Sequence, residues 1–167
     1  VAVMMSKRAP SARRRYLGEL CRVTVLDSTV RRALSPDCAA GLAAAFSEKG
    51  SLPTATMAAC EADKSADLAA VKSAMDAARI PSTYQDRVLF REACVCISTR
   101  AAKLSAMGIA ALLAMGPPAM SGKPGATIAV DGTVFEKYPW FKARPPHHLP
   151  RGPRARTRAA PATPRHP

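Results

Sequence analysis

The chain has 167 residues, which suffices for one domain with a single modest core. Its formal net charge of +13 resides at the two ends: residues 1–15 hold five basic side chains, residues 142–167 hold seven, and neither segment holds an acid. Residues 16–141 hold the other 13 basic residues and all 12 acidic ones, so this part of the chain is nearly neutral. This distribution argues against a folded face shaped for DNA or RNA, and we predict no specific nucleic-acid partner.

Composition divides the chain into three predicted parts. Residues 1–15 form a basic segment and residues 142–167 a Pro/Arg-rich tail; both are predicted to be disordered, because they have too few bulky apolar side chains to form a core. Residues 16–141 are the predicted folded part. No apolar run approaches the roughly 18–20 residues of a membrane span, so none is predicted. We expect a cytoplasmic location, and the Arg/Ser-rich, acid-free start leaves organellar targeting open.

Two helices are predicted in the first third of the chain. Residues 14–26 suit a helix by their apolar spacing. Three of its apolar residues fall on one side: Tyr16, Leu20 and Val23. A second helix is predicted to begin at Ser35–Pro36, because serine favours the N-cap and proline the first helical position; Gly50 is its expected stop.

Two further helices are predicted before residue 116. Ser65 is expected to cap a helix that ends before Pro81. The apolar residues of this helix recur at helical spacing: Leu68, Val71 and Met75. The longest element is predicted to run from about residue 82 to about residue 115. Its C-terminal half is apolar around most of its girth, so we expect it to be buried on several sides.

A β-hairpin is predicted after a loop rich in Pro and Gly at residues 116–125. Ile128 and Val130 alternate before the turn pair Asp131–Gly132, and Val134 follows this pair. With the helices before it, the hairpin predicts an α/β fold that is rich in helix.

Side chains with catalytic chemistry form no convincing cluster in this sequence. Seven carboxylates are scattered through helical sequence and are expected to be solvated: Glu19, Asp27, Glu61, Asp63, Asp67, Asp76 and Glu92. The five cysteines lack the spacing of a zinc site and are expected to be small buried thiols, and all three histidines lie in the tail. No glycine-rich phosphate loop is present. These residues alone predict neither a catalytic residue nor a metal site.

Four segments resemble, in order, parts of the large domain of hexokinases. YLGEL begins at Tyr16 and TATMAACEAD at Thr54; CISTRAAKLSAMGIAALL begins at Cys96 and ATIAVDGTVFEKYPWF at Ala126. The last segment is similar to the family's hairpin, VGVDGxxYxxxPxF. The resemblance covers residues 16–141 and implies an actin-like ATPase fold, in which these residues form a helix-rich part of the larger lobe with one β-hairpin.

The resemblance implies three segments that contact a nucleotide. In the hairpin, five successive residues carry these contacts: Thr133, Val134, Phe135, Glu136 and Lys137. Thr133 is the best of them, because its amide and hydroxyl can both donate to phosphate oxygens. Thr54, Thr56 and Met57 form the second segment, and Arg15 stands in the third. The structural alternatives are helix capping for Thr54 and strand propensity for Thr133.

The resemblance also implies the substrates and cofactor: ATP with Mg²⁺, and a hexose. The sugar-binding loops of the family and the Asp that acts as general base have no counterpart in this sequence. We therefore predict a hexokinase-family ATP:hexose phosphotransferase, which forms hexose 6-phosphate at the entry to glycolysis. It is expected to be a fragment or an incorrectly bounded gene model, inactive on its own. The alternative is a non-catalytic interaction or regulatory protein derived from a hexokinase, which would associate with full-length hexokinase.

Overall fold

The computed structural model describes residues 16–114, 130 and 132–141. These residues form seven helices, and no strand is found among them. The helices are α1 (Tyr16–Leu26), α2 (Ser28–Arg31), α3 (Pro36–Ala45), α4 (Thr54–Ala62), α5 (Ala69–Ala77), α6 (Tyr84–Ala114) and α7 (Thr133–Lys137). The segments predicted to be disordered, residues 1–15 and 142–167, lie outside the described residues.

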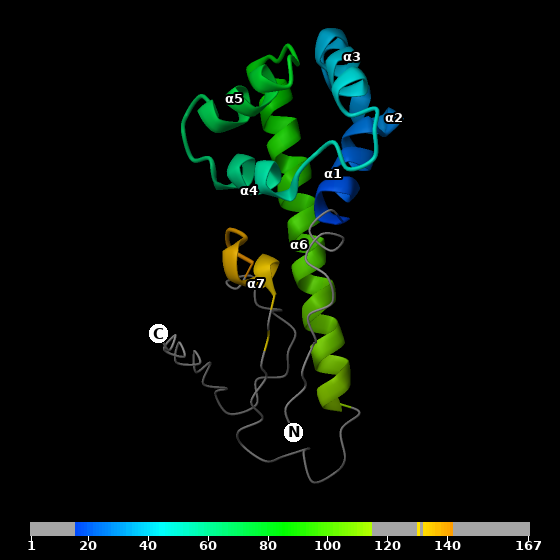
Figure 1. The fold of residues 1–167 in the computed structure, drawn as a ribbon, viewed down its shortest axis with the longest axis vertical. Coiled ribbons are helices and arrows are strands. Elements are labelled where there is room, and N and C mark those ends of the chain that lie inside the picture. Colours follow the sequence, from blue (N-terminus) through cyan, green and yellow to red (C-terminus); the bar gives the residue numbers. More distant parts are fainter. Residues whose placement is uncertain (1–15, 115–129, 131, 142–167) are drawn as a thin grey trace, which may run out of the picture.

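The long helix α6 is the axis of the arrangement. Its 31 residues correspond to roughly 46 Å at the rise of an α-helix, and its bounds confirm the longest predicted element. Helices α1, α4 and α5 pack directly against α6, and α2 and α3 pack on α1 (Figure 1). The C-terminal half of α6 extends beyond these helices (Figure 1). The N-terminal half of α6 therefore forms one wall of the core.

Two of the predicted helix starts are confirmed by their caps. The Ser35 hydroxyl accepts a hydrogen bond from the Cys38 amide at 3.4 Å, and Pro36 is the first helical residue of α3. At the start of α6, the Thr83 hydroxyl accepts from the Asp86 amide at 3.2 Å, while Asp86 accepts from the Thr83 amide at 2.8 Å. Such reciprocal bonds satisfy backbone donors that have no partner within the helix.

The expected end of the second helix at Gly50 is wrong. The helix α3 ends at Ala45, and Phe46 is its C-cap residue, whose amide donates to the Leu42 carbonyl. Phe46 turns into the core and stacks on Phe90, with ring centroids 6.5 Å apart. Gly50 instead takes a φ of 80° in the loop that follows, which glycine adopts without a steric cost.

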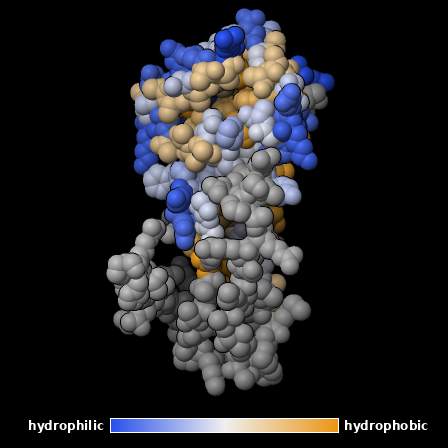
Figure 2. All heavy atoms as spheres, viewed as in Figure 1, coloured by the Kyte–Doolittle hydropathy of each residue, from blue (hydrophilic) through white to orange (hydrophobic). Residues whose placement is uncertain are grey.

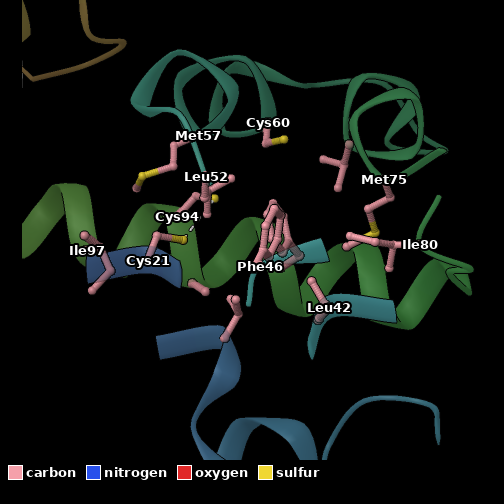
Figure 3. Packing of buried hydrophobic residues seen from close by; sticks show 14 of the residues in the cluster. Cys21, Leu42, Phe46, Leu52, Met57, Cys60, Met75, Ile80, Cys94 and Ile97 are labelled. Carbon is pink, nitrogen blue, oxygen red and sulfur yellow. Dashed lines mark hydrogen bonds between the residues drawn. The ribbon is translucent and has the colours of Figure 1, made fainter. Parts of the chain in front are cut away.

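The core is filled by aliphatic and sulfur-containing side chains from α1, α3, α4, α5 and α6 (Figure 3). Its largest fully buried members are Leu42, Leu52, Met57, Met75, Ile80, Val25 and Val71. Burial of a side chain of this size contributes about 1.5–3 kcal/mol to the free energy of unfolding. A single continuous cluster therefore holds the helices together, as the length of the chain predicted.

Four of the five cysteines belong to this core, as predicted, and Cys96 is exposed. Cys21 of α1 and Cys94 of α6 meet with their sulfur atoms 3.8 Å apart (Figure 3). Burial raises the pKa of the Cys38 and Cys60 thiols to about 11. At neutral pH these two side chains are thiols, and they act as small apolar residues rather than nucleophiles.

The apolar side of α1 that the sequence places at Tyr16, Leu20 and Val23 is exposed. These side chains are 66%, 43% and 54% exposed, whereas Leu17 and Cys21 on the opposite side enter the core. The reason lies in Gly18, where an added Cβ would lie 2.0 Å from the Leu52 carbonyl oxygen. Glycine at this position lets α1 approach the loop before α4, and this close approach selects the buried side.

The expectation that the C-terminal half of α6 is buried on several sides is wrong for the described residues. Leu104 is 49% exposed and Met107 is 64% exposed. The helices that cover α6 reach only its N-terminal half. The apolar composition of Tyr84–Ala111 is sufficient, by length and composition alone, for a membrane span. This is weak evidence for a span, because the core helix of a soluble protein meets the same criterion.

The prediction that a second strand follows the turn at Gly132 is wrong. Thr133–Lys137 forms α7, in which the Glu136 amide donates to the Gly132 carbonyl at 2.9 Å and the Tyr138 amide to the Val134 carbonyl at 3.0 Å. Local bonds of this kind satisfy the backbone without a partner strand. Ile128 and Asp131 lie outside the described residues. The helix-rich part of the predicted fold class is confirmed, and the actin-like arrangement stays a prediction.

Candidate functional site

The N-terminal end of α4 carries Thr54, Thr56 and Met57, one of the segments predicted to contact a nucleotide. The Thr54 hydroxyl oxygen accepts a hydrogen bond from the Gly18 amide at 3.3 Å. This bond joins the two sequence segments YLGEL and TATM at the point where α1 comes closest to the loop before α4. One role of Thr54 is therefore to satisfy a backbone donor in the first turn of α1, and its contact with a nucleotide stays a prediction.

Met57 and Thr56 follow in the same helix turn. The Met57 side chain is completely buried in the core, so only its backbone could reach a ligand. Thr56 is half-buried. The amides of both residues donate to the Pro53 carbonyl, at 3.1 Å for Thr56 and 3.3 Å for Met57. In the first turn of α4, these hydrogen bonds of Thr54, Thr56 and Met57 are thus made with other protein groups.

The C-terminal end of α4 carries a buried carboxylate, that of Glu61. One of its oxygens, Oε2, accepts from the Ser98 hydroxyl of α6 at 2.7 Å and from the Tyr138 hydroxyl at 2.9 Å. Glu61 is 2% exposed, and Tyr138 is also buried. Burial, together with the charge of Glu61, raises the pKa of Tyr138 well above its ordinary value. The phenol therefore stays protonated and donates to Glu61. The two hydrogen bonds of Glu61 join the end of α4 to α6 and to the residue after α7.

Asp63, two residues later, organises the start of α5. Its Oδ1 accepts from the Ser65 amide and hydroxyl, at 2.9 and 2.5 Å, and its Oδ2 accepts from the Ala70 and Val71 amides. The Ser65 hydroxyl lowers the pKa of Asp63 most, and these backbone amides lower it further. The Ser65 hydroxyl oxygen in turn accepts from the Ala69 amide at 2.8 Å. The N-cap residue of α5 is nevertheless Leu68, so the prediction that the helix begins at Ser65 is wrong, and Asp63 and Ser65 bind the amides of its first turn from outside the helix.

The expectation that the helical carboxylates are solvated is wrong for Glu61 and Asp63. Both side chains lie in the interior, with several donors directed at their oxygen atoms. A buried carboxylate is tolerated when its oxygens are hydrogen-bonded, and such partners come from other helices or loops. The sequence signal that could have indicated this is the position of Glu61 among alanine and cysteine, near the end of an otherwise apolar helix.

Two more carboxylates fasten loops to helices. Asp86 accepts from the amides and hydroxyls of Ser35 and Thr83, so it ties the start of α3 to the start of α6. Burial alone would raise the pKa of Asp86, but these four hydrogen bonds outweigh it and lower the pKa.

Glu19 accepts two hydrogen bonds from Arg22 and one from the Gly50 amide. Arg22 first, and then Gly50, lower the pKa of Glu19 to about 2.

The helix α7 carries the predicted nucleotide contacts Thr133 to Lys137, and it lies beside the middle of α6, below α4 (Figure 1). Thr133, Glu136 and Lys137 are exposed, while Val134 and Phe135 are partly buried. No side chain caps α7 at Gly132. The hydroxyl of Thr133 and the ammonium group of Lys137 are thus on the surface of the protein, where a ligand can reach them.

The residues that follow α7 fasten it to the end of α4. Tyr138 enters the core and meets Phe141 edge to face, with ring centroids 6.3 Å apart. The Lys64 ammonium nitrogen lies 4.5 Å from the centroid of the Trp140 ring, which is a cation–π contact. The segment is therefore held from one side by Glu61 and from the other by Lys64.

The predicted nucleotide residues attach to different parts of the core. Thr54 is bonded to α1, whereas α7 is fastened through Tyr138 to the far end of α4 and to α6. Arg15 lies outside the described residues. Within the described residues, no group of three or more His, Cys, Asp or Glu is placed to hold a metal ion. The roles of Glu61, Ser98 and Tyr138 were not predicted from the sequence.

A shallow groove of 520 Å³ runs along α6, away from these segments. It is lined by Glu92, Val95, Cys96, Thr99, Arg100, Lys103 and Leu104. Hydrophilic and apolar residues alternate across the visible face of the α1–α5 region (Figure 2). Among the described residues, none of those predicted to contact a nucleotide lines the groove, so the groove provides no support for that site.

A family model for hexokinase matches residues 13–152. The chain belongs to the hexokinase family. The hexokinase of Schwanniomyces occidentalis is 33% identical over 131 residues, which cover 77% of this chain and 26% of that protein. Hexokinase-1 of Schizosaccharomyces pombe is 38% identical over 65 residues, covering 39% of this chain and 12% of that protein. Human hexokinase HKDC1 is 28% identical over 127 residues, covering 75% of this chain and 13% of that protein.

This membership confirms the resemblance inferred from the four sequence segments. The matched residues include α1, α4, α6 and α7, which are the helices that carry the candidate site. The chain spans about a quarter or less of the length of these hexokinases.

Proposed function

We propose that this chain supplies part of the nucleotide site of an ATP-dependent hexose kinase, within its large domain. One observation carries the proposal: in a member of the hexokinase family, the exposed residues of α7 are fastened to the core through Tyr138 and Glu61. A ligand-contacting segment needs both exposure and a fixed position, and α7 combines them.

The exposed groups on α7 suit a nucleoside triphosphate. The Thr133 hydroxyl can donate to a phosphate oxygen, and the Lys137 ammonium group can neutralise phosphate charge. The Glu136 carboxylate can accept from ribose hydroxyls but would repel a phosphate, which places the phosphates nearer Thr133. Mg²⁺ in kinases is held largely by phosphate oxygens and water, so the ion would arrive with ATP.

We also propose that the chain by itself does not phosphorylate a hexose. The transfer needs a base that accepts the proton of the attacking hydroxyl, held in line with the phosphate. Glu61, Asp63 and Asp86 are buried, and their oxygens are directed at protein donors. Glu19 is engaged with Arg22 and Gly50. These carboxylates hold the fold together and are poorly placed to accept a proton from a sugar.

Titration calorimetry of the full chain with MgATP tests the nucleotide site. We expect Thr133→Val to weaken binding by about threefold to tenfold, which corresponds to the loss of one hydrogen bond. Thr99→Val on α6 is the matched control and should bind as the wild type does. A wild-type chain that binds no MgATP at millimolar concentration would refute the proposed contact. A coupled assay with ATP and glucose should show no turnover, and turnover would contradict the second proposal.

Non-catalytic association with a full-length hexokinase is a second candidate function. It is favoured by the exposed apolar side of α1 at Tyr16, Leu20 and Val23. Pull-down with a full-length hexokinase should then recover a complex that Leu20→Lys disrupts. Ala40→Lys, which adds the same charge to an exposed position of α3, should leave it intact. If neither the wild type nor the control recovers hexokinase, this function is excluded.

A further inference from the structure

The helix α7 depends on contacts outside itself for its position. It has five residues, no buried residue and no side-chain cap. Isolated helices of this length are unstable in water, because few hydrogen bonds offset the cost of ordering the backbone. Its order therefore depends on tertiary contacts, both those of its own Val134 with the core and those of the residues next to it. Tyr138 follows the helix directly, and its amide donates to the Val134 carbonyl at 3.0 Å, so the ring is fixed to the last turn of α7.

The Tyr138 ring is in turn fixed by Glu61. Its hydroxyl and that of Ser98 both lie within hydrogen-bond distance of the same oxygen, Oε2 of Glu61. The Ser98 bond comes from α6 and restricts the rotation of the carboxylate, so Tyr138 meets an acceptor whose position is already determined. A buried carboxylate oxygen that has lost its contact with water depends on protein donors such as these. Glu61 is therefore the main polar anchor of the segment after α7.

We propose that Glu61 is a positioning residue for the nucleotide-contacting residues of α7, acting through Tyr138. The inference rests on the proposed nucleotide site. Glu61 lies in the interior and does not touch the ligand; it sets the place of Thr133 and Lys137 relative to the core. After loss of this bond, the contacts that still hold the segment include the Lys64–Trp140 contact and the apolar contacts of Val134 and Phe141. These contacts permit α7 to shift while the core stays folded.

Trp140 provides a direct reporter of this movement. It is the only tryptophan of the chain, lies two residues after Tyr138 and is about half exposed. Quenching of its fluorescence by acrylamide measures how tightly the segment is held. We expect Tyr138→Phe and Glu61→Ala to increase quenching and to weaken MgATP binding by about tenfold, while the far-ultraviolet circular dichroism stays unchanged. Glu61→Gln retains an acceptor oxygen, so it should restore most of the affinity.

Tyr84→Phe is the matched control, because this exposed ring at the start of α6 lies outside the anchor. It should change neither quenching nor affinity. If Tyr138→Phe fails to fold, Ser98→Ala provides a second test, since it removes one of the hydrogen bonds that position the Glu61 carboxylate and leaves Tyr138 intact. Wild-type affinity in folded Tyr138→Phe or Ser98→Ala overturns this inference alone. A wild-type chain that binds no MgATP overturns the proposed nucleotide site, and the inference with it.

Discussion

Two regions of this protein are held together in different ways. The helices α1, α3, α4 and α5 and the N-terminal half of α6 share one continuous core and several buried carboxylates with multiple donors. Among the described residues, the contacts that fasten the segment from Gly132 to Phe141 include the buried Tyr138, the cation–π contact of Trp140 and several partly buried side chains. The candidate ligand residues are on the second region.

Because of this difference, we expect substitutions in the first region to change the stability of the fold and substitutions in the second region to change ligand binding. A substitution in the first region removes many contacts and lowers the free energy of unfolding, whereas one in the second region moves α7 with little effect on the rest. Binding residues on a lightly held segment depend strongly on each anchor, because few other contacts compensate for its loss. The following substitutions test whether the two regions respond as differently as their contacts indicate.

The largest effect is expected for Met57→Ala in the core. Met57 is completely buried between α1, α4 and α6, so its truncation removes apolar contacts and leaves a cavity (Figure 3). We expect the free energy of unfolding to fall by about 2–5 kcal/mol, measured by chemical denaturation. Met107→Ala at an exposed position of α6 is the control and should change it by less than about 0.5 kcal/mol. Similar losses for both would contradict the described core.

Gly18→Ala should have the next largest effect. The added methyl group would lie 2.0 Å from the Leu52 carbonyl oxygen, so α1 must move away from the loop before α4. We expect a loss of about 1–3 kcal/mol in thermal or chemical unfolding. The same substitution at Gly108, where nothing lies within 4 Å, should stabilise α6 by about 0.5–1 kcal/mol. A gain at both positions would show that α1 does not approach Leu52.

Acid should weaken the first region through Glu19. Its pKa is lowered from an ordinary value of 4.5 to about 2, mainly by the Arg22 hydrogen bonds. A lowered pKa means that the folded state favours the charged form, so the stabilisation is complete above pH 4.5 and is lost as the pH falls towards 2. Urea denaturation at several pH values should show this decline, and Glu19→Gln should flatten it. Glu92→Gln is the control and should retain the decline.

The smallest effect is expected for Lys64→Gln. The cation–π contact with Trp140 lies at the surface, where such contacts contribute about 0.5–1 kcal/mol. We expect the free energy of unfolding to be nearly unchanged and the quenching of Trp140 fluorescence by acrylamide to increase. Lys72→Gln on the exposed side of α5 is the control. If Lys64→Gln destabilises the core as much as Gly18→Ala does, the two regions are more strongly coupled than their contacts indicate.

The sequence predicted the features that depend on near neighbours in the chain. The cap at Ser35 and the extent of α6 are confirmed. Each depends on hydrogen bonds and spacing within a few residues, which the order of amino acids contains directly. The four segments similar to hexokinases also identified the family, since the family match covers them.

The features that failed depend on residues far apart in the chain. Apolar spacing marks an apolar side of α1, but the approach of Leu52 to Gly18 decides which side is buried. The alternation around Val134 resembles a strand, yet this stretch forms a helix fastened by the residues that follow it. A local pattern is satisfied equally by either arrangement, so tertiary contacts make the choice.

The candidate site shows the same division. From the sequence alone, the resemblance to hexokinases implied that Thr133 to Lys137 contact a nucleotide. Only the tertiary structure showed that Glu61, expected to be solvated, is buried and accepts hydrogen bonds from Ser98 and Tyr138. These residues lie 37 and 77 positions from Glu61. The chain must fold before they meet, and no local pattern in the sequence determines that contact.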